Sequence, residues 1–196
     1  MAVVALATSL VIVSCTSTTT SPHEAKRAHV SPAGSVVTSS VGRPDTPTLR
    51  CSDYIGTDPP STGMRVVDRV VALPAAPRLP ALQTARTGSA DHAVRLFAKW
   101  GLSIRTGATF TLAVPRRLAR VASIGWGPSI KPTRTLTVPS CRAGRARWLA
   151  YAGGYFVRHT MCLPLAVRTH GIRSVVHIGV GAGCPGQRPP PEPTQR

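Results

Sequence analysis

The stretch CLPLAVRTHGIRSVVHIGV (residues 162–180) decides the fold class of this chain. Apolar residues alternate with other residues on both sides of His170-Gly171, a pattern typical of two strands joined by a tight turn. One face of the expected hairpin carries Leu163, Leu165, Val167, Val176, Ile178 and Val180. The sequence therefore predicts an antiparallel strand pair with one buried face near the end of the chain.

Upstream of this hairpin, Gly and Pro separate further short apolar runs in the same way. The expected strands are 65–73, 102–105, 109–114, 120–124, 133–138, 147–151 and 155–157. About eight short strands in one body predict an all-β fold, an antiparallel β-sandwich of the immunoglobulin-like or jelly-roll-like kind.

One segment, 89–100, departs from the strand pattern. Ser89 suits the start of a helix, apolar residues recur at helical spacing up to Trp100, and Gly101 offers a stop. We therefore expect one short helix that packs on the sheets. The rival interpretation is a strand, based on the alternation of Val94, Leu96, Ala98 and Trp100.

The first 14 residues carry no charged side chain and are mostly apolar. Their apolar part is shorter than the roughly 20 residues of a membrane-spanning helix, so a signal peptide is expected. The sequence Ile12-Val13-Ser14-Cys15 resembles the lipobox of bacterial lipoproteins, which implies acylation of Cys15 and a mature chain that begins there. No Lys or Arg precedes the apolar run, which leaves an ordinary cleaved signal, or no export, as alternatives.

Four cysteines remain once Cys15 is set aside, and an exported chain leaves the reducing cytosol, so two disulfides are expected. Three pairings are possible. We favour Cys141–Cys162, which flank a predicted hairpin, together with Cys51–Cys184, which would join the two ends of the domain. A four-thiolate zinc site is disfavoured because the chain has no Cys-x-x-Cys pair.

Composition divides the chain into four parts. Residues 1–14 form the signal peptide, and 15–50 form a disordered tether rich in Ser, Thr and Pro that has no aromatic residue. Residues 51–187 form the disulfide-bonded β-sandwich domain. Residues 188–196, with four prolines, form an extended and solvated tail.

The charge balance is strongly positive, with a formal net charge of +17. Between His92 and Pro191 the chain has fifteen basic residues and no Asp or Glu. A positive field of this kind attracts polyanions, so anionic lipids or anionic cell-wall polymers are the expected partners. The candidate anion contacts are Arg142, Arg145, Arg147 and Arg158. Specific nucleic-acid binding is not expected, because Trp and Phe in strands usually belong to the core.

Motifs for catalysis or cofactor binding are scarce. Gly179-Val180-Gly181-Ala182-Gly183 follows a strand but precedes a Cys-Pro pair and a Pro-rich tail, so it lacks the helix that a phosphate-binding loop requires. No cofactor and no metal site are predicted. Trp126, between Gly125 and Gly127, is a candidate for an exposed aromatic that stacks on a sugar ring, and core packing is its alternative.

Several stretches together resemble a group of uncharacterised secreted or lipoprotein-like proteins of actinobacteria such as streptomycetes. The similar stretches cover residues 80–187 and include Arg95-Leu96-Phe97-Ala98-Lys99, Ile124-Gly125-Trp126-Gly127 and Ala152-Gly153-Gly154-Tyr155. The resemblance implies an exported domain and brings no activity and no catalytic residue.

The sequence therefore predicts an exported, lipid-anchored protein of the cell envelope, on the outer face of the cytoplasmic membrane or secreted. Its domain is expected to be a non-enzymatic binding or structural module with a basic surface. One alternative is a carbohydrate-active hydrolase that uses Asp53, Asp58, Asp68 and Asp91 as its source of paired carboxylates. The other is a protein-interaction module that presents a sheet edge or the Pro-rich tail.

Overall fold

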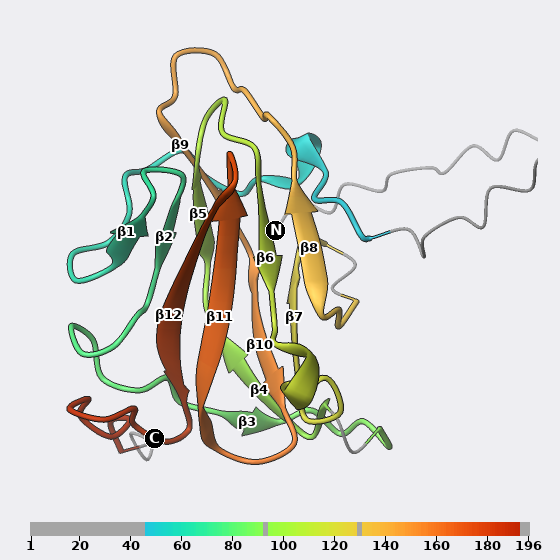
Figure 1. Cartoon of the computed structure of the whole chain (residues 1–196), viewed down its shortest axis with the longest axis vertical. Coiled ribbons are helices and arrows are strands. Elements are labelled where there is room, and N and C mark those ends of the chain that lie inside the picture. The colour runs from blue at the N-terminus through green and yellow to red at the C-terminus, as the bar shows by residue number, and fades with distance from the viewer. Residues whose placement is uncertain (1–45, 92–93, 129–130, 193–196) are drawn as a thin grey trace, which may run out of the picture. The chain divides into compact units, whose positions relative to one another are not determined.

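The hairpin expected near the end of the chain is the longest strand pair of the structure (Figure 1). β11 (Met161–Thr169) and β12 (Ile172–Val180) pair antiparallel, with Leu163 opposite Ile178 and Leu165 opposite Val176. His170 and Gly171 both have positive φ, at 44° and 79°, which suits a tight turn whose twist matches that of the strands. The prediction from residues 162–180 is confirmed.

The structure is a computed structural model, and it describes residues 46–91, 94–128 and 131–192. In this part of the chain, twelve strands form three four-stranded antiparallel sheets that are not closed barrels. β11 and β12 belong to the sheet ordered β12-β11-β6-β8, with β6 at Phe110–Ala113 and β8 at Thr135–Val138. The predicted all-β antiparallel class is therefore confirmed.

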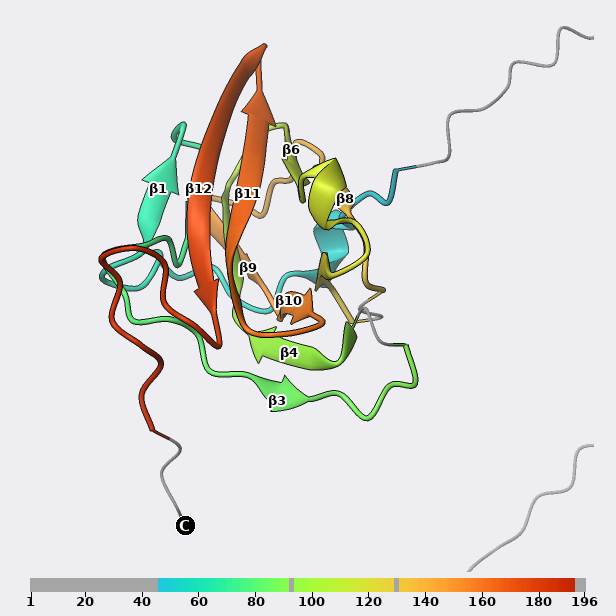
Figure 2. The same ribbon diagram turned by 60° about the horizontal axis from the view of Figure 1, so that its bottom comes forward.

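Figure 2 shows β3, β4 and β10, from the other two sheets, below β11 and β12, and β9 behind them. The sheet ordered β1-β2-β5-β9 consists of Arg65–Val67, Val71–Leu73, Leu102–Arg105 and Trp148–Tyr151. The sheet ordered β3-β4-β10-β7 consists of Ala85–Arg86, Leu96–Lys99, Gly153–Val157 and Ala122–Trp126. Short 3-10 helices in the described part of the chain include η1 (Cys51–Asp53) and η3 (Arg116–Leu118).

Two expectations about local structure are corrected. The run 65–73 is two strands, because Asp68 and Arg69 take positive φ values of 46° and 60° and turn the chain back on itself. Within the segment 89–100, where a helix was expected, residues 92 and 93 lie outside the described residues, and Leu96–Lys99 form the strand β4, as the rival interpretation proposed. A short amphipathic helix has little stability by itself. As a strand, β4 instead hydrogen-bonds to β3 on one side and to β10 on the other.

A bent strand pair joins two of the sheets. β4 and β5 follow one another along the chain, as do β9 and β10, and the pairing Lys99–Gly154 continues in register into the pairing Leu102–Tyr151. The bend lies at Trp100-Gly101 and Ala152-Gly153, where the Trp100 N–H donates to the Gly153 carbonyl at 2.8 Å. One continuous ribbon therefore runs through both sheets.

Two disulfides are present, as predicted, but the favoured pairing is wrong. The bonds are Cys51–Cys141 and Cys162–Cys184. β8 and β11 each pair antiparallel with β6, so they run parallel to each other. Cys141 follows the end of β8 and Cys162 lies at the start of β11, which puts these two cysteines at opposite ends of the sheet.

Both observed pairings follow from local chain path. Residues 46–49 run beside β8, where the Leu49 N–H donates to the Thr137 carbonyl at 2.8 Å, and this delivers Cys51 to Cys141. The chain after β12 turns back at Gly181, whose φ is positive, and this brings Cys184 to Cys162. Leu49 is buried, so the folded domain begins before Cys51.

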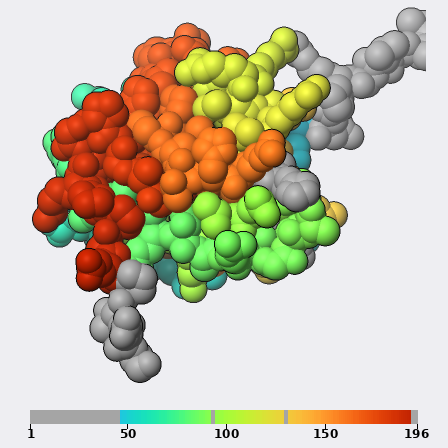
Figure 3. Space-filling model, turned by 90° about the horizontal axis from the view of Figure 1, so that it is seen from below, coloured from blue at the N-terminus to red at the C-terminus, as the bar shows by residue number. Residues whose placement is uncertain are grey.

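The C-terminal segment is bound to the domain up to Pro191, in contrast to the solvated tail expected from 188 onward. The Ala81 N–H donates to the Arg188 carbonyl at 2.9 Å, and Gln83 Nε2 donates to the Pro191 carbonyl at 2.7 Å. Figure 3 shows these C-terminal residues in red against the green segment that contains residue 81. The first 45 residues, with the expected signal peptide, Cys15 and most of the tether, lie outside the described residues.

No helix in the part of the chain that the structure describes is long and apolar enough to cross a membrane. The two disulfides indicate an oxidising, extracellular environment.

Candidate functional site: a basic groove

The largest of the described cavities is a groove of about 710 Å³ on the outer face of the sheet β12-β11-β6-β8. Four arginines line it: Arg116, Arg134, Arg168 and Arg173. We call this surface the basic groove. Among the described residues, its lining contains no Asp, no Glu and no aromatic residue.

Strand alternation explains the floor of the basic groove. Leu112, Leu165 and Val167 point into the core and are buried, so their neighbours along each strand point outward. The outward residues in the middle of the sheet are small, and the register places Ala166 opposite Ala113 and Ala113 opposite Thr135. Methyl and hydroxyl groups therefore form the floor, which leaves the sheet open to a ligand.

Two of the four arginines stand side by side at one end of the groove. The register of the long hairpin places Arg168 of β11 directly opposite Arg173 of β12, and both side chains are exposed. Like charges directly opposite each other on a sheet destabilise it. The fold therefore keeps an unfavourable pair at this position.

The other two arginines lie at the far side of the same face. Arg116 begins η3, directly after Pro115 ends the run of β6. Arg134 precedes β8, and its carbonyl accepts a hydrogen bond at 2.8 Å from the Val114 N–H, which ties the two segments together. The residues that line the groove thus extend from Arg168 and Arg173, next to the β11–β12 turn, to Arg116 in η3.

No ion pair among the described residues compensates the charge of the basic groove. None of the four groove arginines has an ion pair or a side-chain hydrogen bond there, and the salt bridge between Arg50 Nε and Asp53, at 4.0 Å, lies outside the groove lining. A second hollow, of about 370 Å³, extends the basic surface over the β11–β12 turn, where His170 lies beside the shared Arg168 and Arg173. This surface is suited to hold a ligand with several negative charges.

No family model, curated protein or solved structure matches this chain. The site must therefore be interpreted from its own geometry.

The structure separates the arginines that the sequence analysis proposed as anion contacts. Arg142, Arg145 and Arg147 are exposed on the connection between β8 and β9, at the top of Figure 1. Arg158 is exposed at the opposite end, between β10 and β11, where its N–H donates to the Val121 carbonyl. None of these four lines the basic groove, and their role in anion contact stays a prediction.

The four groove arginines were not singled out from the sequence. A signal for two of them was present, because Arg168 and Arg173 flank His170-Gly171 at positions that a tight hairpin brings face to face. Arg116 and Arg134 carry no such signal, since their approach depends on how β6 and β8 pair.

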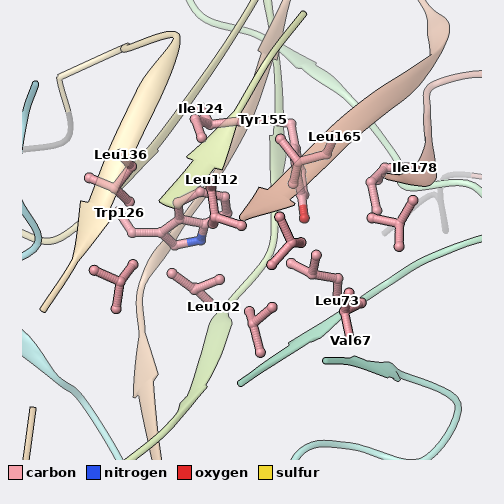
Figure 4. Packing of buried hydrophobic residues seen from close by; sticks show 14 of the residues in the cluster. Val67, Leu73, Leu102, Leu112, Ile124, Trp126, Leu136, Tyr155, Leu165 and Ile178 are labelled. Carbon is pink, nitrogen blue, oxygen red and sulfur yellow. The ribbon is translucent and has the colours of Figure 1, made fainter. Parts of the chain in front are cut away.

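Trp126 belongs to the core, and its candidacy as an exposed aromatic is not supported. Its side chain is 6% exposed, and its Nε1 donates to the Trp100 carbonyl at 2.9 Å. The ring packs edge-on against Tyr155 with centroids 5.5 Å apart (Figure 4). Complete burial raises the pKa of the Tyr155 hydroxyl, which therefore stays protonated.

The four aspartates of the hydrolase alternative lie on separate elements. Asp53 lies in η1 and lines a small cavity of about 180 Å³. Asp68 lies in the β1–β2 turn, where its Oδ1 accepts a hydrogen bond from Ser174 Oγ at 2.9 Å. Asp58 and Asp91 lie in connections outside strands, and none of the described cavities is lined by two carboxylates.

The charge of Asp53 affects the neighbouring Tyr151 hydroxyl. Burial raises the pKa of the Tyr151 hydroxyl, and the nearby negative charge of Asp53 and the Tyr54 side chain add to the rise. The Tyr151 hydroxyl donates to the Cys51 carbonyl at 3.4 Å, next to the Cys51–Cys141 bond. The hydrogen bond and the disulfide together hold η1 against the domain. Among the described residues no cluster of three or more His, Cys, Asp or Glu is present.

Proposed function

We propose that this protein is a non-enzymatic binding module of the cell envelope, which acts outside the cytoplasm and contacts anionic lipids or anionic wall polymers through its basic surface. The observation that carries the proposal is the basic groove, whose described lining contains four exposed arginines and no carboxylate. A hydrolase of the two-carboxylate kind needs both groups across one bond, and the separate positions of the aspartates favour binding over that chemistry.

The position of the protein in the envelope follows from the leader. The lipobox-like sequence that ends at Cys15 supports a lipid anchor, and the two disulfides support a place outside the reducing cytosol. A single anchor near a basic domain would hold that domain close to anionic lipids and wall polymers.

Anion binding by the whole chain has a direct test. The Cys15→Ala chain, which has no thiol for acylation, is mixed with phosphatidylglycerol vesicles, with phosphatidylcholine vesicles, and with beads that carry long-chain polyphosphate. We expect sedimentation with at least one anionic partner at about 0.15 M salt, and release at about 1 M, where charges are screened beyond about 3 Å. Equal binding to phosphatidylcholine, or binding that persists at high salt, would contradict the proposal.

Acylation has a separate test in a bacterial host that processes lipoproteins. The unaltered chain is expected to incorporate radiolabelled palmitate and to partition with membranes, and Cys15→Ala is expected to abolish both. Cys15→Ala leaves the four disulfide cysteines in place, so folding of the domain provides the control. Labelling that persists unchanged in this variant would refute the lipid anchor.

A further inference from the structure

We propose that the basic groove binds one extended chain of a phosphate-bearing polymer without nucleobases, such as a polyol- or sugar-phosphate chain, and that Arg168 and Arg173 together hold one phosphate. This inference rests on the proposed function and names its ligand class. Three features of the groove carry it: its shape, the opposed arginine pair, and a lining that has no aromatic side chain among the described residues.

The shape of the groove favours a chain over a flat membrane surface. Its floor consists of small side chains, and the arginines stand at its two ends. From the spacing and rise of strands, the Cα atoms of Arg168 and Thr135, the neighbour of Arg134, lie about 12 Å apart. A bilayer meets only the exposed rim of such a hollow, whereas an extended chain can lie on the floor and reach both ends.

The opposed pair of Arg168 and Arg173 favours phosphate over carboxylate. Each guanidinium presents a planar fork of N–H donors, and the two stand on adjacent strands in register. A tetrahedral phosphate directs its oxygens away from one plane, so two neighbouring forks can donate to different oxygens. A bound phosphate would also neutralise the repulsion that the empty sheet carries at this point.

The lining argues against nucleic acid as the natural ligand. Proteins that bind single-stranded nucleic acid combine basic side chains with aromatic rings on which bases stack. In the part of the chain that the structure describes, the lining of the basic groove has arginines and threonines but no Phe, Tyr, Trp or His. The bases of a nucleic acid would therefore find no stacking surface there.

The test compares two pairs of arginines of equal charge in the Cys15→Ala chain. Arg168→Gln/Arg173→Gln alters the groove, and Arg65→Gln/Arg86→Gln removes the same charge from exposed positions in β1 and β3, outside the groove lining. Affinity for long-chain polyphosphate is measured by titration calorimetry at several salt concentrations. We expect the groove pair to bind about ten-fold or more weakly, with a log–log salt slope smaller by about 2, and the control pair to change little.

Folding of the groove variant is checked by its thermal unfolding. Because the substitution removes two opposed like charges, we expect a midpoint equal to or above that of the Cys15→Ala chain. Equal losses of affinity in both pairs would overturn the groove as the site while leaving anion binding by the protein intact. Absence of binding to any anion in the Cys15→Ala chain would instead remove the proposed function itself.

Further arms test the ligand class. Tight binding of poly-glutamate at matched charge would overturn the preference for phosphate, and single-stranded DNA that binds ten-fold more tightly than polyphosphate would overturn the preference for a chain without bases. If the groove variant no longer binds phosphatidylglycerol vesicles but still binds polyphosphate, the ligand of the groove is a lipid headgroup, and the proposed polymer is wrong. Orthophosphate is expected to bind far more weakly than the long chain, because it reaches one end of the groove only.

Discussion

A chain in which Cys51 and Cys141 are both replaced by alanine is expected to lose about 4.5 kcal/mol of unfolding free energy, from the entropy of the loop that the bond closes. The two cysteines are 90 residues apart, so the bond restricts nearly half of the chain in the unfolded state. Cys141 is fully buried, so its truncation adds a cavity to this loss. The measurement is urea-induced unfolding followed by fluorescence.

The second disulfide provides the matched comparison. Cys162 and Cys184 are 22 residues apart, and the same model gives about 3.4 kcal/mol for their replacement by alanine. The order of the two losses is therefore the decisive result. A larger loss for the Cys162/Cys184 variant than for the Cys51/Cys141 variant would contradict the loop-entropy account.

Gly154→Ala is expected to cost about 4 kcal/mol or more, or to prevent folding altogether. Gly154 lies in β10 between β4 and β7, and a Cβ atom there would collide with the Ala98 carbonyl oxygen and with the Phe97 ring. The carbonyl belongs to the backbone of a paired strand, so it cannot move aside without breaking the sheet. Soluble yield and the urea midpoint measure the effect.

Gly101→Ala is the control for this substitution. Gly101 lies in the same bent ribbon, and a Cβ atom there would meet the Tyr151 carbonyl oxygen at 3.6 Å, an ordinary contact distance. We expect its effect to stay within about 1 kcal/mol. Similar losses for both variants would show that close backbone approach is not what Gly154 provides.

The sequence predicts those parts of the fold that depend on neighbours along the chain. The β11–β12 hairpin was recognisable because alternation on both strands and the His170-Gly171 turn agree. The segment 89–100 satisfied helical and strand periods at once, and the choice was made by pairing with β3, just upstream, and with β10, which comes from a distant part of the sequence. Local pattern alone could not decide between them.

The disulfide pairing and the basic groove depend on the relative direction of strands. Cys141 and Cys162 look like neighbours in sequence, yet the parallel course of β8 and β11 separates them. The groove arginines come together for the same reason, through the pairing of β6 with β8 and with β11. The net charge of the sequence indicates a positive field, and the strand order shows that part of it is concentrated in the basic groove.

The bent ribbon of residues 96–105 and 148–157 has a consequence for the way this domain opens. Because β4 continues into β5 and β9 into β10, the same two segments supply hydrogen bonds to both sheets. Unzipping one sheet therefore removes the partners of the other, so local opening in either would spread through the bend. We therefore expect the two sheets to unfold as one cooperative unit. Neither sheet is then expected to open alone beneath the long hairpin β11–β12.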